Sequence, residues 1–557
     1  MTRLSAGAAP ALLSLCAALL TAACGASHSG DTPPASPPPP EAGACPNNST
    51  DTARFATADE LYALNETLAS YGDRPTGGAH HQAYYAWLKS QVEAVPGIQI
   101  SELPYDIDLW TPTTVALSAG ASAGSLADLP ASGPVPYAKA GDVSGTLLYV
   151  PAGTAVADSD VAGKIVLRDA ETSATPFYDL DLVSWWVYDP DLSLTLNSIG
   201  TYERDAGGYN ARIQDLKDAA AGGAAGLIFL HSFPRDQVLG HYAPYEGLRW
   251  GVPALYVGAD EAEQLKQLAG SGGLARIRLA NTDTPTTIRM LVATLPGQSS
   301  EKIVIESHTD GMNAVWDNGP LVMLAQARYF AALGIDCRPK TLQFVFTTAH
   351  IYQQLFPPFR HGGSGQFAKM LDDSYDDGTL DYVLALEHFG ALEYDAVPRA
   401  DGGPGRELVQ TGKSEINTVF MSDSAALVAA TAAAIAGRGV ERTYGLRGAA
   451  LPVAGFPPFR DFGGEGTPYQ EHALPTVGFI TGPWSLYNPS FGMEAIDKDL
   501  MYRQALAYTD LLHTTIPLSR AVLAGGVTQE RAARAAACAA GYTSTSDCPG
   551  ATSYPAP

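Results

Sequence analysis

The second half of this chain alternates short apolar runs with amphipathic stretches, and that alternation limits its fold more than any other feature. Helical periodicity covers residues 320–333, 422–436 and 500–512. The apolar runs, which are typical of strands, cover residues 302–306, 341–346, 382–386 and 475–481. Strands that alternate with helices build mostly parallel sheets covered on both faces. The sequence therefore predicts an α/β domain over residues 282–518, with a mostly parallel sheet flanked by helices.

Side chains able to bind a metal follow three of these predicted strands. His308 and Asp310 end the first, His350 follows the second, Glu387 ends the third, and Asp317 precedes a helix. The carboxyl ends of parallel strands open at one edge, where such sheets bind ligands, and imidazole and carboxylate groups are zinc ligands. We therefore expect a site at this edge. The structural alternatives are that His308 and Asp310 hydrogen-bond a loop and that Asp317 caps the helix.

Residues 112–281 have a different character, with short strand-like runs between turns. They resemble a protease-associated domain in a Gly-Lys-Ile-Val strand, an Ala-Gly-Ala-rich step from helix to strand, and a Val-Pro-Ala strand before a Glu-rich helix. The resemblance implies a non-catalytic, β-rich insert. Residues 51–111, with two helical patterns, would then be the N-terminal part of the main domain. His80 and His81 open the second of these patterns, and we assign them no role.

The segments around this insert resemble the zinc aminopeptidase superfamily, which includes bacterial secreted aminopeptidases, glutamate carboxypeptidase II, glutaminyl cyclase and the transferrin receptor. The motifs that carry the resemblance are an Arg-Pro-Thr-Gly loop at residues 74–77, His308-Thr309-Asp310, Asp317-Asn318-Gly319, a strand ending at Ala349-His350, a strand ending at Glu387, and Glu465-Gly466 before a Leu-Pro turn. The likeness covers nearly the whole chain after its N-terminal segment. It implies the same α/β fold with a protease-associated insert.

Members of this superfamily hold two zinc ions, and the resemblance implies how much of each cage this chain keeps. The first ion would have His308, Asp317 and Glu387, with Glu387 in place of the family's Asp. The second would have Asp317, His350 in place of a Glu, and Gly466 in place of a His. Because glycine offers no ligand, the resemblance implies a degenerate site with one zinc ion or none.

The general base of the family is a Glu, and Ala349 stands at its position. His350 could act as the base instead, because the unperturbed pKa of histidine suits that task. Asp310, in the His-x-Asp motif, is the second catalytic candidate, and Glu465 or His388 could also be recruited. Loss of a positioned base typically costs about 10²–10⁴-fold in rate, so we expect weakened or altered activity.

Four further residues have open roles. His388 follows Glu387, but strand alternation places it on the opposite side and favours a structural role. His472 could swing toward the second ion, although nothing requires it. The pentapeptide Phe-Pro-Pro-Phe-Arg occurs twice and ends at Arg360 and Arg460. These arginines could bind a substrate carboxylate, or the repeat could be a chance recurrence of Pro-rich turns.

Two classes of function remain open. The first is an exported, zinc-dependent exopeptidase-like hydrolase with a remodelled site, or a variant that catalyses acyl transfer as glutaminyl cyclases do. The second is a binding protein that keeps the peptidase fold as a scaffold, as the transferrin receptor does. Both imply a peptide or peptide-like substrate or ligand.

The N-terminus predicts export. Residues 1–24 have a basic start, an apolar run and a final Leu-Thr-Ala-Ala-Cys that resembles a bacterial lipoprotein cleavage box. We expect Cys24 to be lipidated, with a plain secretory signal as the alternative. Residues 25–50 are rich in proline and predict an extended linker. The net charge of −24 argues against nucleic acid and anionic membranes as partners, so membrane contact is expected only through a lipid anchor.

Four cysteines follow the predicted signal, at positions 45, 337, 538 and 548. An even number in an exported protein suggests disulfides, but four cysteines allow three pairings. Cys538 and Cys548 are close together in the tail, residues 519–557, and are the expected local pair. The partners of Cys45 and Cys337 stay open.

Overall fold

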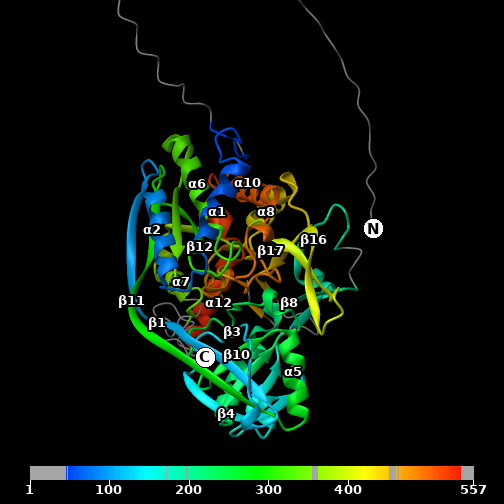
Figure 1. Cartoon of the computed structure of the whole chain (residues 1–557). Helices are drawn as coiled ribbons and strands as arrows, with labels where there is room; N and C mark the ends of the chain where they lie inside the picture. Colours follow the sequence, from blue (N-terminus) through cyan, green and yellow to red (C-terminus); the bar gives the residue numbers. More distant parts are fainter. Residues whose placement is uncertain are drawn as a thin grey trace, which may run out of the picture. The chain divides into compact units, whose positions relative to one another are not determined.

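The computed structural model describes residues 45–46, 48–170, 172–194, 199–353, 362–450, 459–460 and 463–540 (Figure 1). The predicted signal segment with Cys24, Arg360 and Cys548 lie outside these residues. None of the described helices combines the length and hydropathy that a membrane span requires.

A mostly parallel sheet forms the centre of the main domain, as the sequence predicts. Its parallel core is β13 (Thr341–Thr347), β12 (Lys302–His308), β14 (Leu380–Leu386) and β21 (Thr476–Thr481), in that spatial order. β17 (Asn417–Met421) joins β21 antiparallel, and β18 (Thr443–Arg447) joins β17 parallel. The predicted fold class is therefore confirmed.

Both faces of this sheet are buried, which explains its unbroken apolar strands. Ile303 and Ile305 of β12 belong to one hydrophobic core, while Val304 between them belongs to another. The first core is completed by helices α1 (Ala58–Ser70), α2 (Ala79–Glu93), α6 (Gly319–Leu333), α8 (Ala425–Gly437) and α10 (Lys498–Thr515). The second is completed by α7 (Gly362–Asp373), with Tyr469 of α9 (Gly466–Glu471).

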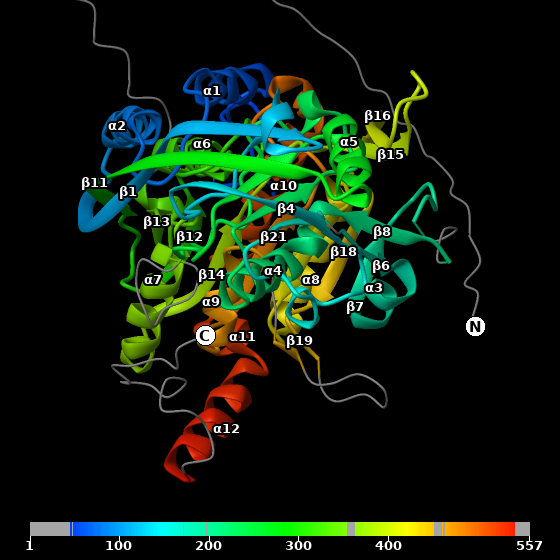
Figure 2. The same ribbon diagram turned by 60° about the horizontal axis from the view of Figure 1, so that its bottom comes forward.

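A long two-stranded ribbon connects this sheet to a second one (Figures 1 and 2). β1 (Gln99–Gly120) and β11 (Leu274–Leu295) pair antiparallel from Gln99 and Thr294 to Gly120 and Leu274. One end of β11 pairs with β13 and the other with β4 (Gly141–Val150). The second sheet continues from β4 through β5 (Ile165–Asp169) and β9 (Gly226–Leu230) to β10 (Ala254–Val257) and β3 (Gly133–Pro134).

The second sheet has its own hydrophobic core, to which α4 (Tyr209–Ala221) and α5 (Ala259–Gly270) contribute. The protease-associated character of residues 112–281 stays a prediction. One segment inside that range lies elsewhere, because β7 (Ser184–Tyr188) pairs with β18 at the edge of the main sheet. The remaining elements are β2 (Ala127–Leu129), β6 (Ser173–Pro176), α3 (Phe177–Val183), β8 (Thr201–Arg204), β15 (Leu392–Pro398), β16 (Arg406–Ser414), β19 (Ala449–Ala450), β20 (Phe459–Arg460), α11 (Arg520–Ala524) and α12 (Val527–Ala540).

Two of the sequence's cysteines close a large covalent loop. Cys45 is disulfide-bonded to Cys337, at a sequence separation of 292 residues. Cys538 is also disulfide-bonded, but Cys548 lies outside the described residues, so their pairing stays a prediction.

Candidate metal centre

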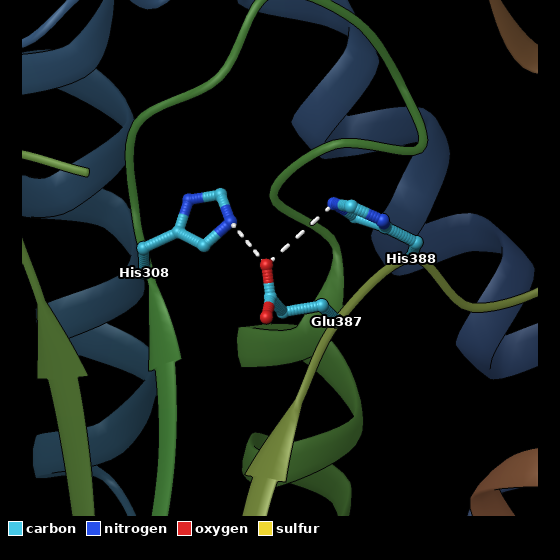
Figure 3. A group of neighbouring side chains, drawn as sticks. All are labelled: His308, Glu387 and His388. Atoms are coloured by element: carbon cyan, nitrogen blue, oxygen red, sulfur yellow. Dashed lines mark ion pairs between the residues drawn. The ribbon is translucent and has the colours of Figure 1, made fainter. Parts of the chain in front are cut away.

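The carboxyl ends of β12 and β14 bring three ligand side chains together (Figure 3). The strands are parallel neighbours, so His308 at the end of β12 lies beside Glu387, which follows β14. His308 Nε2 is 3.4 Å from Glu387 Oε2, and His388 Nε2 is 3.7 Å from the same oxygen. All three side chains are buried. Within the described part of the chain, no other group of three or more His, Cys, Asp or Glu residues has ligand atoms this close together.

The prediction that His388 points away from Glu387 is wrong. β14 ends at Leu386, and His388 has a left-handed backbone with φ 58°. Side chains alternate only while the strand continues, so this turn returns His388 to the side of Glu387. The Asn318 side chain fixes the turn, because it accepts a hydrogen bond from Phe389 N and donates one to Phe389 O, both at 2.8 Å.

Backbone carbonyls set the tautomer of both histidines. His308 Nδ1 lies 2.8 Å from Asp310 O, and His388 Nδ1 is hydrogen-bonded to Thr481 O. A carbonyl oxygen only accepts, so each Nδ1 must donate, which leaves a lone pair on each neutral Nε2. Neither Nε2 nor Glu387 Oε2 has a hydrogen-bond partner among the described residues. Three potential ligand atoms therefore face one another, an arrangement that a bound cation would satisfy.

The geometry of this group fits a zinc ion. Zinc binds imidazole nitrogen and carboxylate oxygen at about 2.0–2.1 Å, so two ligands of a tetrahedral ion lie about 3.3–3.4 Å apart. The His308–Glu387 distance of 3.4 Å matches this, and the His388–Glu387 distance of 3.7 Å is slightly long. Two histidines and one Glu are a known ligand set of catalytic zinc, with the fourth position left for water.

The protonation states suit a cation as well. Burial opposes the charge of Glu387, but His308, whose Nε2 faces its carboxylate, and the charges of the neighbouring histidines lower its pKa to about 2. Burial lowers the pKa of His388 to about 4, although Glu387 acts in the opposite direction. Burial and His350 lower the pKa of His308, but Glu387 outweighs them and raises it. The carboxylate thus attracts positive charge to this point.

The structure does not support Asp317 as a metal ligand, because Arg74 donates a hydrogen bond to each of its carboxylate oxygens. Arg74 Nε donates to Asp317 Oδ2 at 2.8 Å and Nη2 donates to Oδ1 at 2.5 Å. Both side chains are fully buried. Arg74 is itself held by Asn313 O at 2.6 Å. The Arg-Pro-Thr-Gly loop is visible in the sequence, but the contact of its arginine with Asp317 could not be predicted from it.

Asp310 supports the loop after β13. Its carboxylate accepts hydrogen bonds from Thr76 Oγ1 and from the backbone amides of His350 and Ile351, at 3.4 and 3.1 Å for the amides. Burial opposes its charge, but His81, His308 and His350 lower its pKa. Asp310 is therefore a positioning residue in this structure rather than a group aimed at a substrate.

His350 and Glu465 form a pair beside the three ligands. The His350 ring stacks on His308 with centroids 4.0 Å apart, and its Nδ1 is hydrogen-bonded to Glu465 Oε1. Burial lowers the pKa of His350 and raises that of Glu465 to about 8, against the effect of His308. The backbone amide of Glu465 donates to Glu387 Oε1 at 2.6 Å, so the pair is tied directly to the metal centre.

The sequence analysis gave no role to two buried residues of this region. Glu306 accepts hydrogen bonds from Thr347 Oγ1 at 2.7 Å and Ser364 Oγ at 2.9 Å, and burial raises its pKa well above the usual value. The sequence signal for Glu306 is a single carboxylate within an apolar strand, two residues before His308. His81 is buried, not solvated, and its Nε2 lies 3.1 Å from Thr309 Oγ1.

The other candidates do not reach the centre in the described structure. His472 Nδ1 lies 3.1 Å from Asp372 Oδ2, so the suggestion that it binds the second ion is not supported. Ala349 clusters with Ile107 and Ile288. Arg460 lies in β20, which pairs with β19, but its side chain is outside the described part.

Comparison with solved structures identifies the fold. An aminopeptidase from an Aneurinibacillus species matches with a TM-score of 0.51 and 18% identity, covering 84% of this chain and 96% of that one. A zinc aminopeptidase from Bacillus subtilis matches with a TM-score of 0.54 and 15% identity, covering 82% and 94%. A peptidase precursor from Shewanella amazonensis gives a TM-score of 0.55 and 15% identity, covering 83% and 98%.

These matches show that the chain has the fold of the aminopeptidases it resembles, at low sequence identity. No model of a protein family matches the sequence, and no curated protein matches it either.

Proposed function

We propose that this chain is an exported, zinc-dependent hydrolase of the aminopeptidase type, with one ion held by His308, Glu387 and His388. The observation that carries the proposal is the convergence of two imidazole lone pairs and a carboxylate oxygen that have no hydrogen-bond donor among the described residues. The aminopeptidase fold supports a peptide or peptide-like substrate. The disulfide at Cys45 suits an oxidising compartment, and a lipid on Cys24 would be the membrane anchor.

A zinc ion in such a site polarises a carbonyl group and lowers the pKa of a bound water toward about 7. His350 is the proton acceptor in this proposal. Burial lowers the pKa of His350 and so favours its neutral form. When Glu465 is ionised and accepts a hydrogen bond from Nδ1, Nε2 carries the lone pair that takes up the proton. Asp310 holds the backbone amide of His350 and thereby the position of the ring.

Zinc analysis and an aminopeptidase assay on the purified mature protein test the proposal. The wild type should contain about one zinc ion per chain and release N-terminal residues from peptides. His308→Ala should lose both properties. His472→Ala is the matched control, because that histidine is buried but bound to Asp372, and it should keep both.

A binding protein is the second candidate, favoured by Ala349 and Gly466 at positions where the superfamily has a base and a ligand. Zinc that is bound by the wild type and lost in His308→Ala, without turnover of any peptide, would support this scaffold function. A metal-free and inert wild type would refute the hydrolase.

A further inference from the structure

An apolar surface lies at the end of the main sheet that is farthest from the β1–β11 ribbon. β7 is the last strand of the sheet, beyond β18 (Figure 2). Five of the eleven exposed large hydrophobic side chains among the described residues come from residues 178–199 around it. They are Tyr178, Leu182, Val187, Leu192 and Ile199. Such clustering on one segment marks an interaction surface, whereas single exposed apolar residues do not.

The outer edge of β7 has no backbone partner among the described residues. Its residues pair with Thr443–Leu446 of β18 on one side, and no hydrogen bond joins the other edge to any described backbone. Natural edge strands are usually protected by lysine, proline or a covering element. The β7 sequence, Ser-Trp-Trp-Val-Tyr, has no charge and no proline. An open apolar edge is a template for an added strand.

A β-bulge places two tryptophans beside helix α8. Gly445 pairs with Trp186, but Leu446 pairs with Ser184, so Trp185 is the extra residue. A bulge interrupts the alternation of side chains, and Trp185 and Trp186 both line one hollow of about 260 Å³ against Val428 and Ala429 of α8. This volume lies below the roughly 300–1,000 Å³ of small-molecule sites and suits a single large side chain.

The outward face of α8 is also apolar. The helix has no charged residue, and its exposed positions are Ala425, Ala429, Ala433, Ala436 and Gly437. Exposed helix faces of soluble proteins normally carry charged or polar residues. The open edge, the hollow and the alanine face therefore form one continuous surface, which we call the β7–α8 surface.

Charge selects the kind of partner. Residues 169–203 include no lysine or arginine, and Asp423 lines the hollow. Two cations among the described residues lie close by: Arg447 stacks on Trp185 at 3.7 Å from the ring centroid, and Arg442 Nη1 donates to Ser193 Oγ at 3.4 Å. A second copy of the chain fits poorly, because antiparallel pairing of two β7 strands would bring the acidic flanks of one copy, Asp181 on one side and Asp189 and Asp191 on the other, toward those of its partner.

We propose that the β7–α8 surface binds an extended segment of another protein by strand addition. The segment pairs with the open edge of β7, places an apolar side chain in the hollow, and carries lysine or arginine that neutralises the surrounding aspartates. This binding is independent of the proposed metal centre.

A synthetic peptide that alternates valine and lysine is the probe, with the glutamate analogue as its charge control. Binding is measured by the tryptophan fluorescence of the full chain and by an immobilised-peptide assay. Val187→Lys blocks the edge and Ala429→Lys fills the hollow with a charge. Val409→Lys is the matched control, because Val409 is an exposed strand residue on β16, outside the surface.

The peptide should bind the wild type and Val409→Lys equally, and Val187→Lys and Ala429→Lys about tenfold or more weakly, as expected for loss of a central contact. The glutamate analogue should bind at least about tenfold more weakly than the lysine peptide. Equal binding by all four proteins would overturn the proposal, as would no binding at all. Self-association of the wild type that Val187→Lys abolishes would overturn it in favour of a second copy of the chain.

Discussion

Ala349 shows how one residue changes the chemistry that the fold can support. It has a left-handed backbone with φ 65° and is buried with Ile107 and Ile288. We predict that Ala349→Glu does not restore a general base, because its carboxylate would enter this apolar cluster. An unpaired buried charge costs about 3–5 kcal/mol, so urea unfolding should show a loss of that size.

Ala349→Gly is the control for the backbone. Glycine adopts positive φ freely, so this change should alter the free energy of unfolding by less than about 1 kcal/mol. If Ala349→Glu folds with wild-type stability and raises kcat, the side chain at position 349 faces the substrate and our interpretation of the site is wrong.

Arg74 and Asp317 form a buried pair whose role can be separated from metal binding. Arg74→Met should lower the free energy of unfolding by about 3–5 kcal/mol, because it leaves the Asp317 carboxylate unpaired. The double variant Arg74→Met with Asp317→Asn should recover much of that loss. Denaturant unfolding measures both.

Zinc content distinguishes this pair from a ligand set. A folded Asp317→Asn protein should keep its zinc, because both carboxylate oxygens bind Arg74 in the structure. Loss of zinc in that variant, with His472→Ala unaffected, would return Asp317 to the ligands.

The sequence predicted the proximity of side chains whose position follows from a strand end; their role as metal ligands stays a prediction. His308 and Glu387 lie together because neighbouring parallel strands end at the same edge. His388 was missed because its side depends on a left-handed turn, which no periodicity reveals. The contact between Asp317 and Arg74 was not predicted, because the two residues are 243 positions apart in the chain.

At the scale of elements, the four strands of the parallel core were predicted within about two residues, whereas β17 and β18 were not predicted and the helix starts depended on capping. The predicted helix 422–436 begins later, as α8, because the Ser424 side chain caps it by accepting from Leu427 N at 3.4 Å. The place of β7 was not predictable, since its pairing with β18 joins segments more than 250 residues apart and a local pattern does not specify a distant partner.

Packing between β18 and β7 gives a prediction for this element. A Cβ on Gly445 would overlap the Trp186 indole, so Gly445→Ala should displace β7 and cost about 1–3 kcal/mol, as overpacking does. Trp fluorescence should shift to longer wavelength, and proteolysis between residues 170 and 203 should become faster.

Gly437→Ala is the matched control, because a Cβ there meets no atom within 4 Å. Alanine at the end of α8 should be neutral or stabilising by up to about 1 kcal/mol. If both variants resist protease as the wild type does, the edge strand does not depend on the Trp186–Gly445 contact.

At the scale of the whole molecule, the N-terminal segment of the described chain is held to the main domain in two ways. The Cys45–Cys337 disulfide is the covalent one. The other is a set of hydrogen bonds, in which Thr50 N and Oγ1 each donate to Asp510 Oδ1 at 2.6 Å and Arg438 pairs with the same carboxylate. Because the second set does not need the disulfide, the reduced native chain should keep the same docking.

The disulfide should therefore act mainly on the unfolded state. A cross-link across a separation of 292 residues restricts a long loop, and native disulfides typically contribute about 2–5 kcal/mol. We predict that Cys45→Ser with Cys337→Ser lowers the free energy of unfolding by that amount in guanidinium, while zinc content in native buffer stays unchanged. Reductant should destabilise the wild type more than the double variant, which retains only the disulfide at Cys538. Identical unfolding curves for the two proteins would show that the cross-link does not contribute to stability. Loss of zinc from the double variant would show that the cross-link acts on the folded metal centre.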